Sequence, residues 1–160
     1  MGTIVALLHD VLVTLAVFSF LKDVVPFPLE LDQHFATAVG TLGAVCAQQG
    51  RFEEALALSE RAHALSPWSN MIVGQLAALL LSAGATSRAE TLLDGLRPGT
   101  AWGAPTGMAV FHAMRGEFDR AADWAARAID LRYPLLVALL RPLLGSTPVW
   151  PALARKMNLP

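Results

Sequence analysis

Three copies of a short glycine-centred pattern recur along this chain at a nearly constant interval. They read GRFEEA at 50–55, GATSRA at 84–89 and GEFDRA at 116–121. The first two glycines are 34 residues apart and the last two are 32 apart. Self-similarity at this period is typical of arrays in which each repeat is one pair of α-helices. Such arrays present surfaces to partners, so the pattern predicts an all-α fold and favours binding over chemistry.

Apolar residues at helical spacing predict helices on both sides of each glycine. We expect helices over about 32–49, 52–65, 71–83, 87–96, 105–115 and 118–132. Pro67 and the breaker-rich segment 97–107 separate the pairs. No alternating strand pattern bounded by turn residues occurs in the sequence, so we expect essentially no sheet.

Composition limits the kinds of partner. Hydrophobic residues make up 54% of the 160-residue chain, charged residues make up 16%, and the net charge is -1. There is no basic face for nucleic acid, which we therefore exclude as a partner. The single cysteine, Cys46, excludes an internal disulfide framework and a cysteine-based zinc site. One cysteine suits a reducing compartment, and we expect a cytoplasmic location.

The first 30 residues predict an apolar helix followed by a proline-containing linker. Residues 3–21 are almost long enough to span a bilayer, but His9 and Asp10 interrupt the apolar run. No Lys or Arg precedes the run, so the sequence lacks the start of a signal peptide. Three interpretations stay open for residues 3–25: a core helix, an oligomer interface, or a membrane-associated helix.

The stretch from Ala36 to Tyr133 resembles three tetratricopeptide repeats. The first repeat carries the family pattern at Val39, Leu42, Gly43, Cys46, Gly50, Phe52, Ala55, Ala62 and Pro67. The third carries it at Met108, Ala109, His112, Gly116, Phe118, Ala121, Ala128 and Pro134. The second keeps Leu76, Gly84 and Ala89 but departs from it at Ala77, Leu80 and Leu96.

This resemblance implies an α-α superhelix of about three helix pairs within residues 31–134. The expected repeats cover 36–69, 70–101 and 102–134. In this family the glycine permits the tight turn, the alanines let paired helices approach, and we expect the phenylalanine to fill the core without facing a partner.

The C-terminal residues 135–160 predict capping helices. The sequence TPVWPALARKMNLP at 147–160 resembles the ends of repeat regions in bacterial signalling and regulatory proteins such as kinases, cyclases and transcriptional regulators. Thr147 is the expected N-cap and Pro148 the first helical residue. Trp150, Leu153 and Met157 would form the apolar stripe that covers the last repeat. A partner helix is the alternative.

The resemblance also implies a concave groove lined by the first helix of each pair. Carried onto this chain, its inward positions are Thr37, Gly40, Ala44, Ala47, Met71, Gly74, Ala78, Leu81, Gly103, Thr106, Val110 and Ala113. None of these is Lys, Arg or Asn, so we do not expect a clamp for a C-terminal carboxylate. The lining suits an apolar or helical segment of a protein or peptide. The alternative is that the helices close over a groove too shallow to bind anything.

Residues able to do chemistry are sparse. The four histidines lack metal-ligand spacing, and no catalytic serine motif, phosphate loop or dinucleotide fingerprint occurs. Cys46 and His112 occupy core positions of the family pattern. We therefore expect no catalytic residue, no metal and no cofactor. Trp68 and Trp102 lie in connections, where they could be exposed contact residues.

Three functions are compatible with these observations. The first is a non-catalytic adaptor or scaffold, either alone or as a piece of a larger signalling protein. The second is an assembly factor that acts through residues 3–25, either by associating with a membrane or by forming a homo-oligomer. The third is a hydrolase with an unrecognised site.

Overall fold

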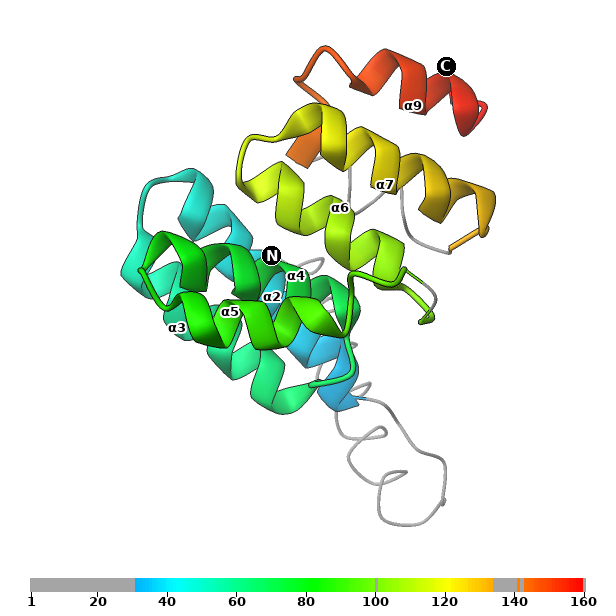
Figure 1. Ribbon diagram of the computed structural model, residues 1–160. Helices are drawn as coiled ribbons and strands as arrows, with labels where there is room; N and C mark the ends of the chain where they lie inside the picture. Colours follow the sequence, from blue (N-terminus) through cyan, green and yellow to red (C-terminus); the bar gives the residue numbers. More distant parts are fainter. Residues whose placement is uncertain (1–30, 100, 134–140, 142, 160) are drawn as a thin grey trace, which may run out of the picture. The chain divides into compact units, whose positions relative to one another are not determined.

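The computed structural model describes residues 31–99, 101–133, 141 and 143–159, with side chains described from Phe35 onward. Within these residues all regular secondary structure is helical (Figure 1). The helices are α2 (Leu31–Gln48), α3 (Phe52–Leu65), α4 (Asn70–Ser82), α5 (Thr86–Asp94), α6 (Ala104–Met114), α7 (Phe118–Asp130) and α9 (Trp150–Lys156). Their pairing is that of an α-α superhelical repeat, which confirms the predicted fold class.

Each helix pair turns at one of the three glycines of the repeated pattern. Gly50, Gly84 and Gly116 have φ angles of +77°, +80° and +74°, in the left-handed region that L side chains rarely adopt. In each turn the residue after the glycine donates its backbone N–H to a carbonyl five residues earlier, at 2.9 Å. This is the Schellman arrangement, which satisfies carbonyls at the end of the first helix. The repeat turns predicted from the sequence are therefore confirmed.

The alanine that closes each pattern lies where the two helices of a pair are closest. Ala55, Ala89 and Ala121 are wholly buried. Ala55 packs with Cys46 of the preceding helix, and Ala89 packs with Leu76 and Leu80. Small side chains at these positions let the helices approach closely. The expected role of the alanines is therefore confirmed.

Helix α4 lies at the centre of the packing. Every residue from Ile72 to Leu80 is buried, because α3, α5 and α6 all pack against it. A helix that is apolar on all sides needs such an environment. Its one buried side-chain amide, Gln75, donates from Nε2 to the Gly40 carbonyl oxygen at 2.8 Å and to Ser59 Oγ at 2.7 Å. These bonds tie α4 to α2 and α3.

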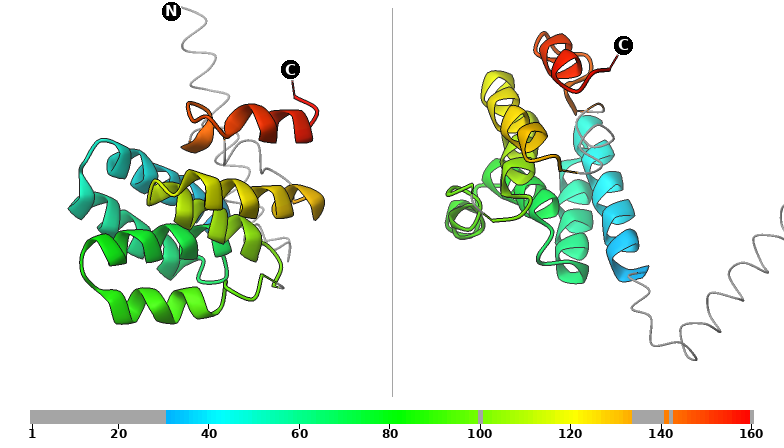
Figure 2. Two further views of the ribbon diagram at one scale, coloured as in Figure 1. Left: turned by 45° about the horizontal axis from the view of Figure 1, so that its top comes forward. Right: turned by 90° about the vertical axis from the view of Figure 1, so that its right-hand side faces the viewer.

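The C-terminal helix α9 packs along α7 (Figure 2). Leu153 is buried against the alanines of α7, and Trp150 and Met157 pack beside it, as the apolar stripe predicted. The expected cap at Thr147 is wrong, because the N-cap is Val149 and the helix begins at Trp150. Thr147 instead bonds back from Oγ1 to the Leu144 carbonyl oxygen at 2.6 Å.

Two expectations concern segments that the structure does not describe. The apolar N-terminal helix expected within 1–30 lies outside the described residues, as does most of 135–144, the first part of the expected capping helices. Among the helices that are described, none is both long and apolar enough to cross a bilayer.

Candidate functional site

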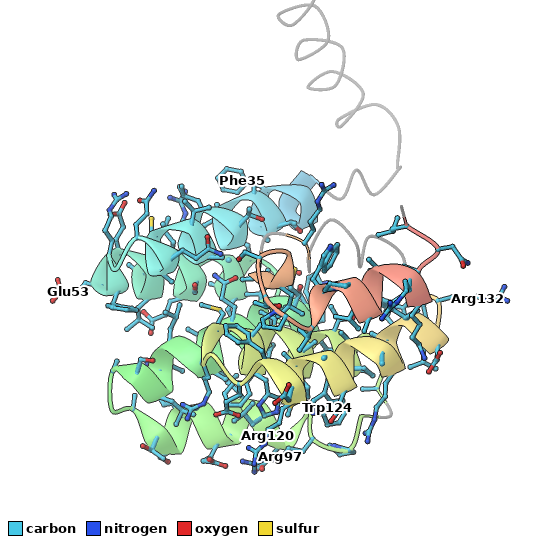
Figure 3. All side chains as sticks on the ribbon, turned by 90° about the horizontal axis from the view of Figure 1, so that it is seen from above. Phe35, Glu53, Arg97, Arg120, Trp124 and Arg132 are labelled. Atoms are coloured by element: carbon cyan, nitrogen blue, oxygen red, sulfur yellow. The ribbon has the colours of Figure 1, made fainter. Side chains whose placement is uncertain are left out.

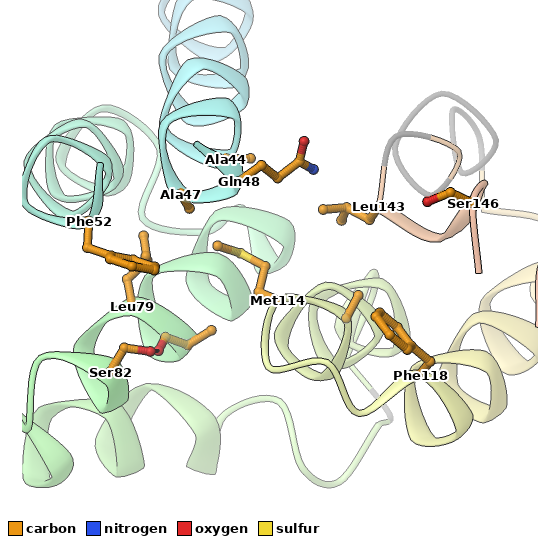
Figure 4. A pocket seen from close by; sticks show the side chains of 12 residues that line it. Ala44, Ala47, Gln48, Phe52, Leu79, Ser82, Met114, Phe118, Leu143 and Ser146 are labelled. Atoms are coloured by element: carbon orange, nitrogen blue, oxygen red, sulfur yellow. Dashed lines mark hydrogen bonds between the residues drawn. The ribbon is translucent and has the colours of Figure 1, made fainter. Parts of the chain in front are cut away.

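A cavity of about 330 Å³ opens between the first helices of the pairs and the C-terminal segment (Figure 4). We call it the groove. It is lined by Ala44, Ala47, Gln48, Phe52, Ala78, Leu79, Ser82, Ala113, Met114, Phe118, Leu143 and Ser146. These residues come from α2, α3, α4, α6 and α7 and from the segment before α9.

Small residues on three parallel helices make room for this cavity. Ala44 and Ala47 of α2, Ala78 of α4 and Ala113 of α6 carry only a methyl group at positions where longer side chains would fill the space. Larger apolar side chains form the walls, and Figure 4 shows Met114 and Leu143 pointing into the space from different elements. None of the described residues that line the groove is charged. Its chemistry therefore suits an apolar, uncharged occupant.

Four of the twelve positions expected to face the groove do line this cavity. They are Ala44, Ala47, Ala78 and Ala113. Leu81 lines a different cavity, shared with Glu90. Gly103 and Thr106 line a third cavity of about 220 Å³, beside Trp102 and Tyr133.

The other five expected positions line none of these three cavities. They are Thr37, Gly40, Met71, Gly74 and Val110. Gly40 faces Ile72, and Gly74 lies against the backbone of Gly107. Val110 is buried, and Met71 packs on the core near Ile72. Of these positions, Gly74 lies where a side chain would meet the backbone of the neighbouring helix, whereas Gly40 has room for one.

The two phenylalanines of the repeated pattern overturn one expectation. Phe52 is 57% exposed and Phe118 is 37% exposed, and both line the groove instead of filling the core. Each is the first residue of the second helix of its pair. Helical side chains lean toward the helix N-terminus, which here is the edge of the groove. Their position two residues after the turn glycine was the sequence signal that could have placed them there.

The residues with reactive side chains lie in the packed interior. Cys46 is fully buried, and His112 is buried with Nδ1 2.7 Å from Glu117 Oε2. Over the described part of the chain, no three His, Cys, Asp or Glu side chains gather as metal ligands would. Trp68 and Trp102 are 68% and 73% exposed, as their places in connections suggested.

Comparison with known proteins agrees with this geometry. A family model described as tetratricopeptide repeat matches residues 47–101, which include the first two glycine turns. This stretch is similar to tetratricopeptide repeats. Tetratricopeptide repeats generally bind proteins or peptides and are generally non-catalytic. The third pair, α6 and α7, lies beyond the matched residues but repeats the same glycine turn and buried alanine.

One curated relative shares a short stretch with this chain. A segment of 42 residues is 50% identical to protein translocase subunit SecF of Rhodothermus marinus. The likeness covers 26% of this chain and 14% of that protein, so the two share only a small part of the relative's length. No solved structure matches the chain.

Proposed function

We propose that this chain is a non-catalytic adaptor or scaffold whose groove holds an apolar, helical segment of a protein partner. The observation that carries the proposal is the lining of the groove, which is uncharged and has small residues from α2, α4 and α6. A carboxylate clamp would need cations or amide side chains converging on one point, and the twelve lining residues offer one amide, Gln48, and no cation.

The shape of the lining favours a helix as the occupant. Amphipathic helices bind by placing side chains at i, i+3, i+4 and i+7 into an apolar groove. The alanines leave depth for such side chains, while Phe52, Phe118 and the flexible Met114 offer contact area at the walls. The exposed phenylalanines would lose contact with water in the complex, which favours binding.

A peptide titration tests this proposal. The probe is a labelled, helix-forming peptide with leucine at i, i+3, i+4 and i+7 and uncharged polar residues elsewhere, measured by fluorescence anisotropy. Ala44→Phe places a ring in the groove at a half-buried position, and Ala57→Phe places the same ring on an exposed position of α3 outside it.

The two variants should differ clearly in their affinity for the peptide. We expect Ala44→Phe to weaken the peptide at least about tenfold, which corresponds to about 1.4 kcal/mol, while Ala57→Phe changes little. Raising the salt concentration should leave the affinity unchanged, since no charge takes part. Equal affinities for the two variants would show that the peptide does not use the groove.

The short likeness to a protein translocase subunit favours a second candidate, an assembly factor. In this alternative residues 3–25 mediate self-association or membrane association. Leu15→Glu in the full chain would place a charge in that apolar run. A change from a larger assembly to a monomer in light scattering, or loss of binding to lipid vesicles, would support the alternative. If the unsubstituted chain is monomeric and does not bind lipid vesicles, this alternative is excluded.

A further inference from the structure

A second cavity, of about 550 Å³, lies on the face of α6 opposite the groove. We call it the cleft. Ala113 and Met114 of α6 face the groove, whereas Phe111 and Arg115 face the cleft. Residues of α5 and α7 form its two sides. Its volume falls in the range of pockets that bind ligands, about 300–1,000 Å³.

The polar contact that bridges the first two pairs has no counterpart between the described helices α5 and α7. Arg88 of α5 and Glu60 of α3 form an ion pair at 3.0 Å between the second helices of the first two pairs. Both α5 and α7 are described, and no ion pair or hydrogen bond is seen between them. Instead, the guanidinium groups of Arg97 and Arg120 approach the same side of the molecule (Figure 3).

The lining of the cleft carries three arginines, Arg97, Arg115 and Arg120, against two carboxylates, Glu90 and Glu117, and Arg97 is already paired with Glu90. The Glu117 carboxylate accepts from Arg115 Nε at 2.9 Å and from Arg120 at 3.3 Å, and it lies 2.7 Å from His112. Hydrogen bonds from Arg115, and then from His112, lower the pKa of Glu117 to about 2, so this carboxylate stays ionised.

One carboxylate therefore serves two arginines. Arg115 and Arg120 each engage Glu117 through one nitrogen, although a guanidinium group carries five N–H donors. The Arg120 side chain is 72% exposed. Both arginines can donate further hydrogen bonds to carboxylate oxygens, and paired N–H groups donating to one carboxylate are a strong arrangement for guanidinium groups.

Part of the cleft wall is apolar. Leu93 and Phe111 are buried along its wall, and Trp124 is half-buried beside them. Arg115 lies 5.7 Å from the centre of the Phe111 ring, and Arg127 lies 4.6 Å from the centre of the Trp124 ring. Cations are thus held next to aromatic surface. An occupant that combines an apolar side chain with a neighbouring carboxylate would match both features.

We propose that the cleft between α5, α6 and α7 binds an acidic segment of a protein partner. One apolar side chain of the segment lies against Phe111 and Trp124, and its carboxylates bind Arg115 and Arg120. This site is separate from the groove, and the proposal does not depend on what the groove binds.

The test measures the full chain against two labelled peptides. The first alternates aspartate or glutamate with leucine and phenylalanine, and the second replaces every acid by its amide. We expect the acidic peptide to bind at least about tenfold more tightly at low salt and to weaken as ionic strength rises, because charges outside the core are screened.

Substitutions locate the binding on the protein. Arg120→Gln should weaken the acidic peptide about fivefold, and Arg115→Gln with Arg120→Gln by more than about tenfold. Arg155→Gln, an equal change of charge at an exposed position on α9, is the matched control. Arg120 is exposed, so the single variant Arg120→Gln should fold even if the loss of Arg115 in the double variant disturbs Glu117. Circular dichroism checks the folding of both variants.

Each outcome decides the proposal. Preference for the acidic peptide, reduced by Arg120→Gln and kept with Arg155→Gln, supports it. Equal binding of acid and amide peptides, or no binding at millimolar concentration, overturns it. Binding of a labelled oligonucleotide through the same arginines in place of the peptide also overturns it. Ala44→Phe should leave the acidic peptide unaffected, so failure of the groove proposal is distinguished from failure of this one.

Discussion

Gly74 of α4 and Gly107 of α6 lie backbone against backbone. A Cβ atom at Gly74 would be 2.0 Å from the Gly107 carbonyl oxygen, and a Cβ atom at Gly107 would be 2.3 Å from the Asn70 carbonyl oxygen. Real Cβ atoms essentially never come within 3.0 Å of another heavy atom. The missing side chains therefore set how closely the second and third helix pairs approach.

We predict that Gly74→Ala destabilises the protein by about 1–3 kcal/mol, because the added methyl group meets rigid backbone. On helix propensity alone, the same change would stabilise a helix interior by about 1 kcal/mol. Chemical denaturation, followed by circular dichroism, measures the difference.

Gly40→Ala is the matched control for this prediction. Gly40 holds the corresponding family position in α2, and its Cβ atom would meet Ile72 at 3.5 Å, an ordinary contact. We expect Gly40→Ala to be neutral or to stabilise by about 0.5–1 kcal/mol. Equal effects of the two substitutions would contradict the proposed role of the Gly74–Gly107 contact.

Leucine at the buried repeat alanines should overpack the helix pairs. Ala55→Leu and Ala121→Leu are each expected to cost about 1–3 kcal/mol, since both alanines are wholly buried against a neighbouring helix. Ala57→Leu, on the exposed face of α3, should change the free energy of unfolding little. Thermal melts of the three variants check this, and unchanged melts for Ala55→Leu and Ala121→Leu would count against the assignment of the repeats.

Gln75→Leu should destabilise the protein by about 1–3 kcal/mol. The substitution keeps the apolar bulk but removes the donor to the Gly40 carbonyl oxygen and to Ser59 Oγ, and these acceptors are buried. In a Ser59→Ala background one of the two bonds is already absent, so the loss should be smaller. Urea denaturation of the unsubstituted protein, the two single variants and the double variant gives the coupling free energy between the two side chains. Strict additivity would mean that they do not interact.

The protein should lose stability in acid through Glu117. Its pKa is lowered from 4.5 to about 2, chiefly by hydrogen bonds from Arg115 and His112. A depressed carboxyl pKa contributes stability that is complete above pH 4.5 and is lost as the pH falls toward 2. Glu117→Gln should therefore reduce stability at neutral pH and flatten its pH dependence in this window. Glu53→Gln removes an exposed carboxylate of α3 and serves as the control.

The repeated pattern was enough to place the helices. The bounds expected from apolar spacing and breakers agree with α3 at both ends, and with α4, α6 and α7 to within two residues. The start of α9 was misplaced at Thr147, because a threonine followed by proline fits a cap locally. The fold instead uses that hydroxyl to bond the preceding turn.

The groove was predicted in part. The alanines of α2, α4 and α6 lie at positions that the resemblance to tetratricopeptide repeats implies for the groove. The phenylalanines at 52 and 118 were assigned to the core, since a large apolar residue in a repeat pattern is usually buried. Their exposure depends on the spacing between neighbouring helix pairs. Contacts between distant parts of the chain set that spacing.

The sequence by itself determined the local structure of this protein. The turn glycines, the small alanines and the spacing of apolar residues each act over a short stretch of chain. They therefore determine the turns, the helices and the pairing of adjacent helices. Only the tertiary structure decided the spacing between pairs. Backbone contact at Gly74 and Gly107 brings α4 and α6 together. The charged cleft lies beside α6, between the second and third helix pairs. Residues far apart in the chain set the spacing between those pairs.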